Sequence, residues 1–567
     1  MGDQPSKVET IKAQSRWLRG HLAEELRDAS TPTVSEEGYQ LLKFHGVYAQ
    51  DDRDVRRARR AAGQMPDYRF MVRAAIAGGV LGPDQYLALE AVAEELGVPS
   101  LRITSRQGIQ FHGVHKFQLR HLIGALNRHL ITTWAGCGDV ERNLTACPAP
   151  WEDGAHRKLG ARAKALAQHL KPRSRAYVEL WMDGEAVYSW EADAEPLYGP
   201  TYLPRKFKTG LTLAGHNCID VLTHDLGLVG HPTPDGEDIA AWTVLVGGGL
   251  GKSHGVAATH PALAQVLGEV ADADVVAAVE AVITVQRDFG NRSDRKFARL
   301  KYLVEAWGID RFRRTVEERM GFSFRPARPL DFEPLDDHLG WHETGPGRGF
   351  LGLWVECGRI VDTPERRLRT ALKEVVRRWR LGVHLTPHQN LLLTGIASPE
   401  RRAIEECLAA HGVKPVEGLS PVQRYGMACP ALPTCGLALT EAERVFSGVA
   451  AALSARWEAL GLGAVPIAVR MTGCPNNCAR PFTAEVGLVG RSPGRYAIYL
   501  GGNAKGTRLA QLWRDAVPLE AVVPALEPLF TAYAARRRPN ERFGDWWARE
   551  GALAGVATEG EPWATTP

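Results

Sequence analysis

The stretch RITSRQGIQFHG, residues 102–113, returns later in the chain as HLTPHQNLLLTG, residues 384–395. A threonine, a glutamine and a glycine recur at the same places, 282 residues apart. At the same offset, ACPAP from Ala146 returns as ACPAL from Ala428. Because ordered matches at one fixed spacing rarely arise by chance, the sequence indicates an internal duplication.

Two later pairs of strings keep this order while the offset drifts. THDLGLVG from Thr223 resembles TAEVGLVG from Thr483, and WTVLVGG from Trp242 resembles YAIYLGG from Tyr496. Each half therefore reads as a small α/β unit followed by a larger one. Two similar halves predict a pseudo-two-fold arrangement with a site at their interface. TGCPNNC in the second half and LPRKFKT in the first stand at broadly comparable places, so one half is expected to hold metal and the other to supply positive charge.

Two turn-like segments of the second half, ACPALPTCGLALTEAER and MTGCPNNCARP, carry four cysteines: Cys429, Cys435, Cys474 and Cys478. Their Pro, Gly, Thr and Asn content places the thiols on turns rather than inside helices. Four thiolates that converge from two turns hold an iron–sulfur cluster or a tetrahedral zinc ion. Both metals stay open on residue chemistry alone, as does plain packing of the thiols as small buried apolar groups.

In LRITSRQGIQFHGV, residues 101–114, apolar and polar residues alternate, which predicts one strand with a single face on the core. The polar face carries arginine, glutamine and histidine, a density that indicates a polyanionic ligand rather than simple solvation. In TYLPRKFKT, Lys206 and Lys208 flank Phe207 and would point the same way on an extended segment. The alternative for this second basic cluster is an exposed edge strand.

No nucleotide motif accounts for the chemistry. VGGGLGKS, residues 246–253, begins with Val246 where a phosphate-binding loop requires glycine, so it is expected to be a glycine turn after a strand. No glycine fingerprint for NADPH or flavin occurs elsewhere, so electrons are expected to come from another protein. The three residues between the cysteines of CPNNC exceed the two of a thioredoxin-like site.

Length and composition indicate a multidomain globular protein. The chain has 567 residues, of which 44% are hydrophobic and 24% charged, with a net charge of +4. This charge is too small to imply nucleic acid. No apolar run of membrane-spanning length occurs, and the N-terminal residues lack the features of a secretory signal or transit peptide. We therefore expect a cytoplasmic protein without membrane partners.

At the two cysteine segments the chain resembles the sirohaem-containing sulfite and nitrite reductases. Further matching stretches are LRITSRQGIQFHGV, TYLPRKFKT, VQRDFGNRSDRK and FHGVYAQDDRDVRR. The resemblance implies an α+β fold, a duplicated chain with two ferredoxin-like repeats plus two α/β lobes around sirohaem. The implied divisions are an N-terminal extension (1–60), a first repeat (61–145), a first lobe (146–330), a second repeat (331–415) and a second lobe (416–567).

The resemblance also implies two cofactors and the residues that hold them. In that family the four cysteines bind a 4Fe–4S cluster, and the last one, here Cys478, bridges to the iron of sirohaem. Sirohaem carries eight carboxylates, whose burial demands charge-assisted donors. The implied sirohaem-binding residues are Arg102, Arg106, Gln110, Lys296 and Asn477.

A further set of cations is implied to bind the anion above the sirohaem iron: Arg73, Arg142, Lys206 and Lys208. Preorganised cations stabilise charge where it develops and help to protonate oxygens that leave as water. Family members often carry a second arginine two residues after the first of these, where this chain has Ala75. That difference removes none of the four anion-binding residues.

The function implied is assimilatory reduction of sulfite to sulfide with six electrons. The alternative is reduction of nitrite to ammonia on the same cofactors, but the nitrite enzymes tend to carry asparagine where this chain has Lys208. The implied electron donor is a ferredoxin or an NADPH-dependent flavoprotein. A non-catalytic metal-binding or scaffold protein is the remaining class of function.

Overall fold

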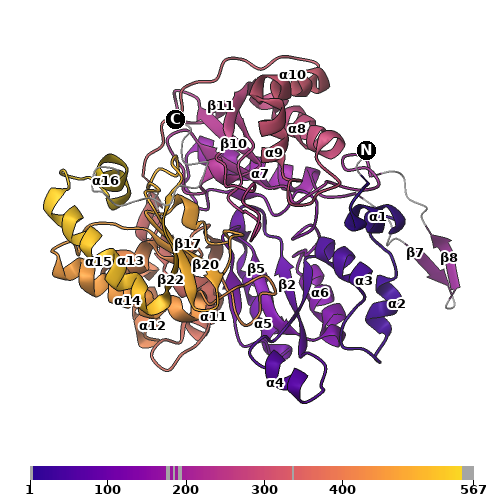
Figure 1. Ribbon diagram of the computed structural model, residues 1–567, viewed down its shortest axis with the longest axis horizontal. Helices are drawn as coiled ribbons and strands as arrows, with labels where there is room; N and C mark the ends of the chain where they lie inside the picture. The colour runs from indigo at the N-terminus through magenta and orange to yellow at the C-terminus, as the bar shows by residue number, and fades with distance from the viewer. Residues whose placement is uncertain (1–3, 174–178, 183–184, 190–194, 335–336, 552–567) are drawn as a thin grey trace.

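The computed structural model describes residues 4–173, 179–182, 185–189, 195–334 and 337–551. Within them the strands form four five-stranded sheets and one two-stranded hairpin, with helices on the outside (Figure 1). The strands are β1 (Val47–Asp51), β2 (Tyr68–Ala74), β3 (Val80–Leu81), β4 (Leu101–Ile103), β5 (Ile109–Val114), β6 (Thr145–Ala146), β7 (Glu179–Met182), β8 (Glu185–Ser189), β9 (Thr209–Leu213), β10 (Leu226–Pro232), β11 (Ile239–Val246), β12 (Gln265–Ala271), β13 (Gly340–Gly345), β14 (Arg348–Leu353), β15 (Arg359–Ile360), β16 (Gly382–Leu385), β17 (Leu391–Ala397), β18 (Met427–Ala428), β19 (Val469–Thr472), β20 (Val486–Ser492), β21 (Arg495–Leu500) and β22 (Gln511–Pro518).

The helices follow the same duplicated order. They are α1 (Lys7–Gln14), α2 (Leu22–Arg27), α3 (Glu36–Leu42), α4 (Arg56–Ala61), α5 (Pro83–Glu95), α6 (Leu119–Arg128), α7 (Gly154–His169), α8 (Val275–Phe289), α9 (Leu300–Trp307), α10 (Ile309–Met320), α11 (Leu368–Trp379), α12 (Arg401–Ala410), α13 (Pro421–Tyr425), α14 (Glu443–Ala459), α15 (Leu519–Arg536) and α16 (Phe543–Glu550), with the short 3-10 helices η4 (Val221–Thr223) and η9 (Pro481–Thr483).

The two halves repeat one topology, which confirms the predicted duplication. Each begins with a ferredoxin-like repeat, β2–α5–β4–β5–α6 in the first half and β14–α11–β16–β17–α12 in the second. Each continues into a lobe whose sheet has three parallel and then two antiparallel strands, ordered β6-β9-β10-β11-β12 and β18-β19-β20-β21-β22. The fold class that the resemblance implies, a duplicated α+β chain with two ferredoxin-like repeats and two α/β lobes, is therefore confirmed.

The repeats also exchange strands. β15 of the second half pairs with β4, where Arg359 lies opposite Arg102. In return, β3 of the first half pairs with β16, where Leu81 lies opposite Val383. Each repeat sheet is thereby completed by a strand from the other half, so the halves are joined by backbone hydrogen bonds on both sides of the pseudo-two-fold axis.

One expected strand is a hairpin. The prediction of a single strand over residues 101–114 is wrong, because β4 ends at Ile103 and β5 begins at Ile109. Gln107 adopts a left-handed backbone with φ 55°, and Thr104 closes the loop, since its hydroxyl accepts from Gly108 N at 3.0 Å. The polar positions still share a face, because antiparallel pairing places β4 and β5 side by side.

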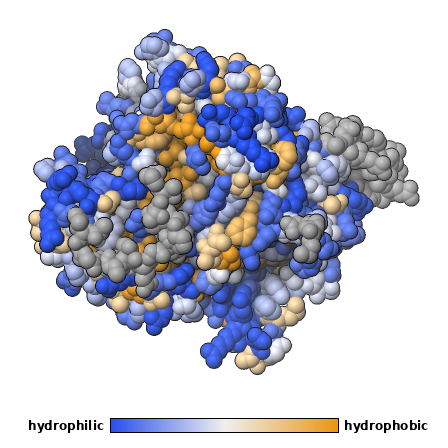
Figure 2. Space-filling view, turned by 45° about the horizontal axis from the view of Figure 1, so that its top comes forward, coloured by the Kyte–Doolittle hydropathy of each residue, from blue (hydrophilic) through white to orange (hydrophobic). Residues whose placement is uncertain are grey.

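Helices cover the outer face of each lobe sheet. α7 packs on β9 and α8 on β12, while α14 packs on β19 and α15 on β21 (Figure 1). β11 reads IAAWTVLV and is buried at every position except Ala240, as expected for a strand covered on both faces. Among the described helices, none is long and apolar enough to cross a membrane. On the face drawn in Figure 2, hydrophilic residues dominate the periphery and hydrophobic ones gather toward the middle.

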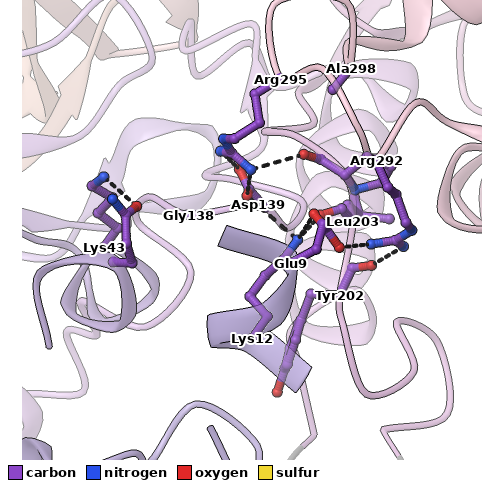
Figure 3. A network of polar contacts seen from close by, with 12 residues as sticks. Glu9, Lys12, Lys43, Gly138, Asp139, Tyr202, Leu203, Arg292, Arg295 and Ala298 are labelled. Atoms are coloured by element: carbon purple, nitrogen blue, oxygen red, sulfur yellow. Dashed lines mark hydrogen bonds and ion pairs between the residues drawn. The ribbon is translucent and has the colours of Figure 1, made fainter. Parts of the chain in front are cut away.

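Helix α1 is fastened to the first lobe by a buried ion network (Figure 3). Lys12 is fully buried, contacts Glu9, donates to Leu203 O at 2.8 Å and lies 3.7 Å from Asp139. Arg295 donates to both carboxylate oxygens of Asp139, at 2.8 and 3.1 Å. Burial alone would raise the pKa of Asp139, but the Arg295 and Lys12 cations hold it well below its usual range.

This network is expected to stabilise the fold strongly. Asp139→Asn leaves the Arg295 cation without its anion and leaves Lys12 with Glu9 alone, and the loss of one partner from a buried pair costs about 3 kcal/mol. The apparent melting temperature should therefore fall by several degrees. Asp331→Asn is the matched control, because its ion pair with Lys505 is exposed and contributes less than about 1 kcal/mol. Equal melting temperatures for the two variants would contradict the analysis.

Candidate functional site

The two cysteine turns leave one end of the second lobe sheet. β18 and β19 are parallel neighbours, and the turns begin directly after Ala428 and Thr472. All four cysteines lie outside helices and strands, as the sequence predicts. Gly473 N donates to the sulfur of Cys429 at 3.4 Å, and the amide of Asn476 donates to the sulfur of Cys474 at 3.5 Å. Such N–H donors favour thiolate sulfur, the form that binds metal.

The four thiols influence one another electrostatically. Burial raises the pKa of Cys429, and the neighbouring Cys478 sulfur raises it further. The same two causes raise the pKa of Cys474 to about 12. Thiols in such surroundings become thiolates when a metal replaces the proton. The four thiols therefore form a donor set that fits a metal centre.

The spacing of the sulfurs separates a cluster from a single ion. No three of these four sulfurs, all of which belong to described residues, lie within 4.8 Å of one another. One tetrahedral zinc ion would draw its sulfurs to about 3.8 Å from each other, given Zn–S bonds of about 2.3 Å. An iron–sulfur cluster spreads its thiolates over several metal atoms. The donor set fits a cluster better than the zinc alternative.

The loop at residues 104–108 joins this turn to the other half. Ser105 donates from its hydroxyl to Cys478 O at 2.8 Å. Arg106 donates to the backbone of Asn143 and, at 3.4 Å, to that of Thr209. The loop therefore touches the cysteine turn on one side and the cation-bearing segments of the first lobe on the other.

A backbone bridge gathers three of the four expected anion-binding cations. Arg142 N donates to Phe207 O at 3.1 Å, and Phe207 N donates to Val140 O at 3.0 Å. This bridge places Arg142 beside the segment that carries Lys206 and Lys208. Within this segment Phe207 forms an isolated parallel bridge with Glu141, Pro204 and Arg205 form a bend, and β9 begins only at Thr209, so the predicted extended form of the two lysine positions stays a prediction.

The two lysines are held in a strongly cationic setting. Burial lowers the pKa of Lys206 well below its usual value, and Lys208, Arg205 and Arg142 lower it further. Burial also lowers the pKa of Lys208, and Arg106 and neighbouring cations lower it further. By surface area both lysine residues are half-buried. Repulsion among these cations is relieved by a bound anion.

Arg73 joins this set from the first repeat sheet. It lies opposite Gln110 on β5, which in turn lies opposite Arg102 on β4, so the three side chains form a row across the sheet. Arg73 donates to the sulfur of Cys137 at 2.9 Å and lies 5.9 Å from the ring centre of Tyr48. Burial raises the pKa of Tyr48, and Arg142 and Arg73 partly oppose that rise, so both arginines lie near this ring.

Arg102 and Gln110 already have protein partners. Arg102 donates from Nε to Glu443 at 3.1 Å and from Nη2 to Ala428 O at 2.8 Å, directly before the first cluster cysteine. Gln110 donates weakly to the sulfur of Met71 at 3.5 Å. Arg102 therefore ties the first repeat to the cysteine-bearing lobe, and its cofactor role stays a prediction.

Lys296 and Asn477 differ in placement. Lys296 is exposed, and its backbone N–H donates to Asp294 at 2.9 Å, so the described contacts do not bring its side chain to the other candidates. Asn477 is buried beside Cys478, and its side-chain oxygen accepts from Phe482 N at 3.2 Å. The sirohaem-binding roles of Asn477 and Lys296 remain predictions.

Unsatisfied buried donors test whether this site fits sirohaem and a cluster. Among the described residues, Arg73 Nε, Arg106 Nε, Asn477 Nδ2 and both ring nitrogens of His112 are buried without a hydrogen-bond partner. Each such group costs about 1–3 kcal/mol when left unpaired. A polyanionic macrocycle between the halves would pair them. The donor set therefore fits sirohaem, as the cysteine turns fit a 4Fe–4S cluster.

Sequence reasoning missed the buried ion pairs behind the site. Arg299 donates to both carboxylate oxygens of Asp225 at 2.9 and 2.8 Å, and Arg480 lies 2.6 Å from Asp220 of the other lobe. The internal repeat contained a signal for the second pair. Asp220 and Arg480 are 260 residues apart, the same offset that separates the repeated strings at Thr223 and Thr483. Opposite charges at duplicated positions suit an interface between the copies.

The expected correspondence of LPRKFKT with TGCPNNC is wrong. LPRKFKT precedes β9, whereas TGCPNNC begins within β19 and runs into the turn after it. The structural counterpart of the second cysteine turn is AGHNC, residues 214–218, which follows β9 and ends four residues before the centre of η4. Short insertions displaced the strings, so order alone did not align them.

A buried carboxyl beside the cations predicts a pH effect. Burial raises the pKa of Glu141 from its ordinary value near 4.5 to about 7, and its oxygens accept from the amide and hydroxyl of Thr209. The folded state therefore binds more protons than the unfolded state between pH 4.5 and 7, and stability falls as pH rises through that window. The melting temperature of Glu141→Gln should therefore depend less on pH than that of the wild type, because glutamine binds no proton. Exposed Glu237→Gln is the control. Parallel profiles of melting temperature against pH for the wild type and both variants would contradict this prediction.

Comparison with known proteins agrees with this geometry. Residues 162–324 and 428–553 match the nitrite and sulphite reductase 4Fe-4S domain. Residues 63–129 match the nitrite/sulfite reductase ferredoxin-like half domain. Among solved structures, NirA of Mycobacterium tuberculosis superposes with a TM-score of 0.77 at 22% identity, covering 96% of this chain and 97% of that chain. This likeness shows the shared fold.

Curated relatives match over nearly the whole chain. The NADPH sulfite reductase hemoprotein beta-component of Myxococcus xanthus is 44% identical over 565 residues, covering 99% of this chain and 100% of the relative. The ferredoxin sulfite reductase of Synechococcus elongatus is 43% identical over 564 residues, covering 96% of this chain and 89% of the relative. The chain belongs to the nitrite and sulphite reductase family.

Proposed function

We propose that this chain is an assimilatory sulfite reductase that reduces sulfite to sulfide with six electrons. The observation that carries the proposal is the loop at residues 104–108, which contacts Cys478 through Ser105 and lies among the cations through Arg106. An electron-supplying centre and an anion-binding group therefore meet at one place. Relatives that match over the whole chain bear the sulfite reductase name.

The residues that would hold the cofactors come from both halves. The cluster would be bound by the four cysteines of the second lobe, with Cys478 also shared with sirohaem. The sirohaem carboxylates would be bound by Arg102, Arg106, Gln110, Asn477 and Lys296. When bound, this pair of groups supplies electrons one at a time to the anion. Unpaired buried donors at Arg106 and Asn477 support the assignment.

Four side chains of the first half would bind and protonate the anion: Arg73, Arg142, Lys206 and Lys208. Burial and neighbouring cations lower the pKa of both lysines, so each amine gives up a proton more readily than an exposed lysine does. Each oxygen of sulfite needs protons to leave as water. A bound anion restores the protonated amine by reducing the repulsion, which prepares the next transfer.

We also propose the domain division expected from the resemblance: an extension (1–60), a first repeat (61–145), a first lobe (146–330), a second repeat (331–415) and a second lobe (416–567). The family matches at 63–129, 162–324 and 428–553 support its main boundaries. β1 pairs with β2, so the proposed extension contributes an edge strand to the first sheet.

The electron donor is proposed to be a separate protein in the cytoplasm, either a ferredoxin or an NADPH-dependent flavoprotein. Relatives of both names match this chain almost equally well, at 44% and 43% identity. Turnover supported by reduced ferredoxin, compared with turnover supported by a flavoprotein and NADPH, distinguishes the two donors.

Changing the two lysines tests the substrate assignment. Lys206→Ala and Lys208→Ala should each lower kcat/KM for sulfite by about 100-fold or more, because each removes a preorganised cation from the developing charge. The visible spectrum should not change, since the cofactor donors remain. Steady-state turnover with sulfite and with nitrite is the measurement, and exposed Lys505→Ala is the control. Unchanged sulfite kinetics, or a much higher wild-type kcat/KM for nitrite, would overturn the assignment.

Changing the shared cysteine tests the coupling of the two cofactors. Cys478→Ser should reduce iron content and disturb the sirohaem absorption together, because one sulfur is proposed to serve both groups. Visible spectroscopy and iron analysis of the purified protein measure this. Cys407→Ser, at a half-buried thiol on α12, should match the wild type. A wild-type spectrum in the Cys478→Ser protein would refute the bridging role.

A further inference from the structure

A second group of metal-ligating side chains lies outside the cluster turns. The sulfurs of Cys147 and Cys218 and a ring nitrogen of His338 all lie within 4.8 Å of one another. The sulfur of Cys147 is 3.7 Å from His338 Nε2. Cys218 and His338 are only 4% and 3% exposed, so the group is internal.

The duplication explains why two thiols meet here. Cys147 follows β6 directly, as Cys429 follows β18, and the pair differs by the recurrent offset of 282 residues. Cys218 stands three residues before η4, as Cys478 stands three residues before η9, with the offset of 260 residues. The first lobe therefore keeps cysteine at two of the four positions that form the cluster site in the second lobe.

The other two positions have changed. At the same offsets, the counterparts of Cys435 and Cys474 are Asp153 and Ala214. Asp153 is occupied as the N-cap of α7, where its side chain accepts from His156 N. Four cysteines for an iron–sulfur cube are therefore not present in the first lobe. The third ligand instead comes from the segment before β13, in the second half.

The distances suit one small ion. Zinc binds thiolate sulfur at about 2.3 Å and imidazole nitrogen at about 2.0–2.1 Å, so tetrahedral S and N ligands lie about 3.5 Å apart. The 3.7 Å between Cys147 and His338 is close to that value. The four sulfurs of the cluster turns, which have no three members within 4.8 Å, lack this compactness.

The imidazole is held in place by its own turn. His338 has a left-handed backbone with φ 54°, a conformation that costs about 1 kcal/mol or more outside glycine. Asp337 anchors the turn, since its carboxylate accepts from Leu339 N at 3.0 Å and from Arg424 Nη2 at 2.9 Å. A strained residue that is fixed on both sides is typical of a functional position.

We propose that Cys147, Cys218 and His338 bind one zinc ion, which links the first lobe to the start of the second repeat. Two soft thiolates and one imidazole match the ligand preference of zinc, which has no redox chemistry of its own. The two thiols lose their protons to solvent on binding. The site stands on its own residues and is independent of the proposed reaction.

Zinc analysis of the full-length holoprotein tests this site. Elemental analysis should find about one zinc per chain in addition to iron, in protein purified without added chelator. X-ray absorption at the zinc edge, to which iron is invisible, should show two sulfurs at about 2.3 Å and nitrogen at about 2.0 Å. Zinc below about one tenth of an equivalent, or a zinc shell without sulfur, would overturn the proposal.

Variants locate the ion. Cys218→Ser combined with His338→Ala should lose zinc while keeping iron and the visible spectrum, which separates this proposal from the proposed function. Cys407→Ser is the control, because Cys407 lies with Glu374 and His411 in the other compact group of ligands among the described residues. Zinc retained by the double variant or lost from the control would overturn the assignment. A disulfide between Cys147 and Cys218 in unreduced protein would do so as well. If the double variant does not fold, the zinc-edge spectrum of the wild type decides.

Discussion

Reciprocal strand exchange between the halves is the constraint on which the rest of the structure depends. β15 completes the first repeat sheet and β3 completes the second, so neither sheet is whole without the other half. Equivalent hairpin loops then meet at the centre. Gln107 Nε2 lies 2.9 Å from three backbone carbonyl oxygens, including that of Leu385 in the other half, and its counterpart Gln389 donates to Ala428 O at 3.1 Å. The contact between Gln107 and Leu385 thereby joins the two halves at these loops.

The duplicated lobes have diverged in charge while keeping their backbone. Asp220 and Arg480 occupy equivalent left-handed positions before η4 and η9, with φ of 52° and 57°, and they pair with each other across the interface. A duplicated position has thus become a complementary ion pair that only a mixed pair of lobes can make. The lobes also differ in their site residues: the second lobe carries the four cysteines of the two turns, and the first carries Lys206 and Lys208.

Local patterns in the sequence predicted the duplication and the turn location of the cysteines. They did not predict the break between β4 and β5, because that hairpin depends on the left-handed backbone of Gln107, which alternation does not report. His338 was missed for a different reason. Its neighbours Cys147 and Cys218 are far away in sequence, and only tertiary packing brings them within ligand distance.

The fastening of α1 has a consequence for synthesis of the chain. Lys12 emerges from the ribosome long before Asp139 and Leu203, which it contacts in the mature fold, and before Arg295, which pairs with Asp139. Until Arg295 has been made, α1 lacks part of the network that fastens it to the first lobe. Helix α1 therefore completes its ion network only after the chain has been synthesised as far as Arg295.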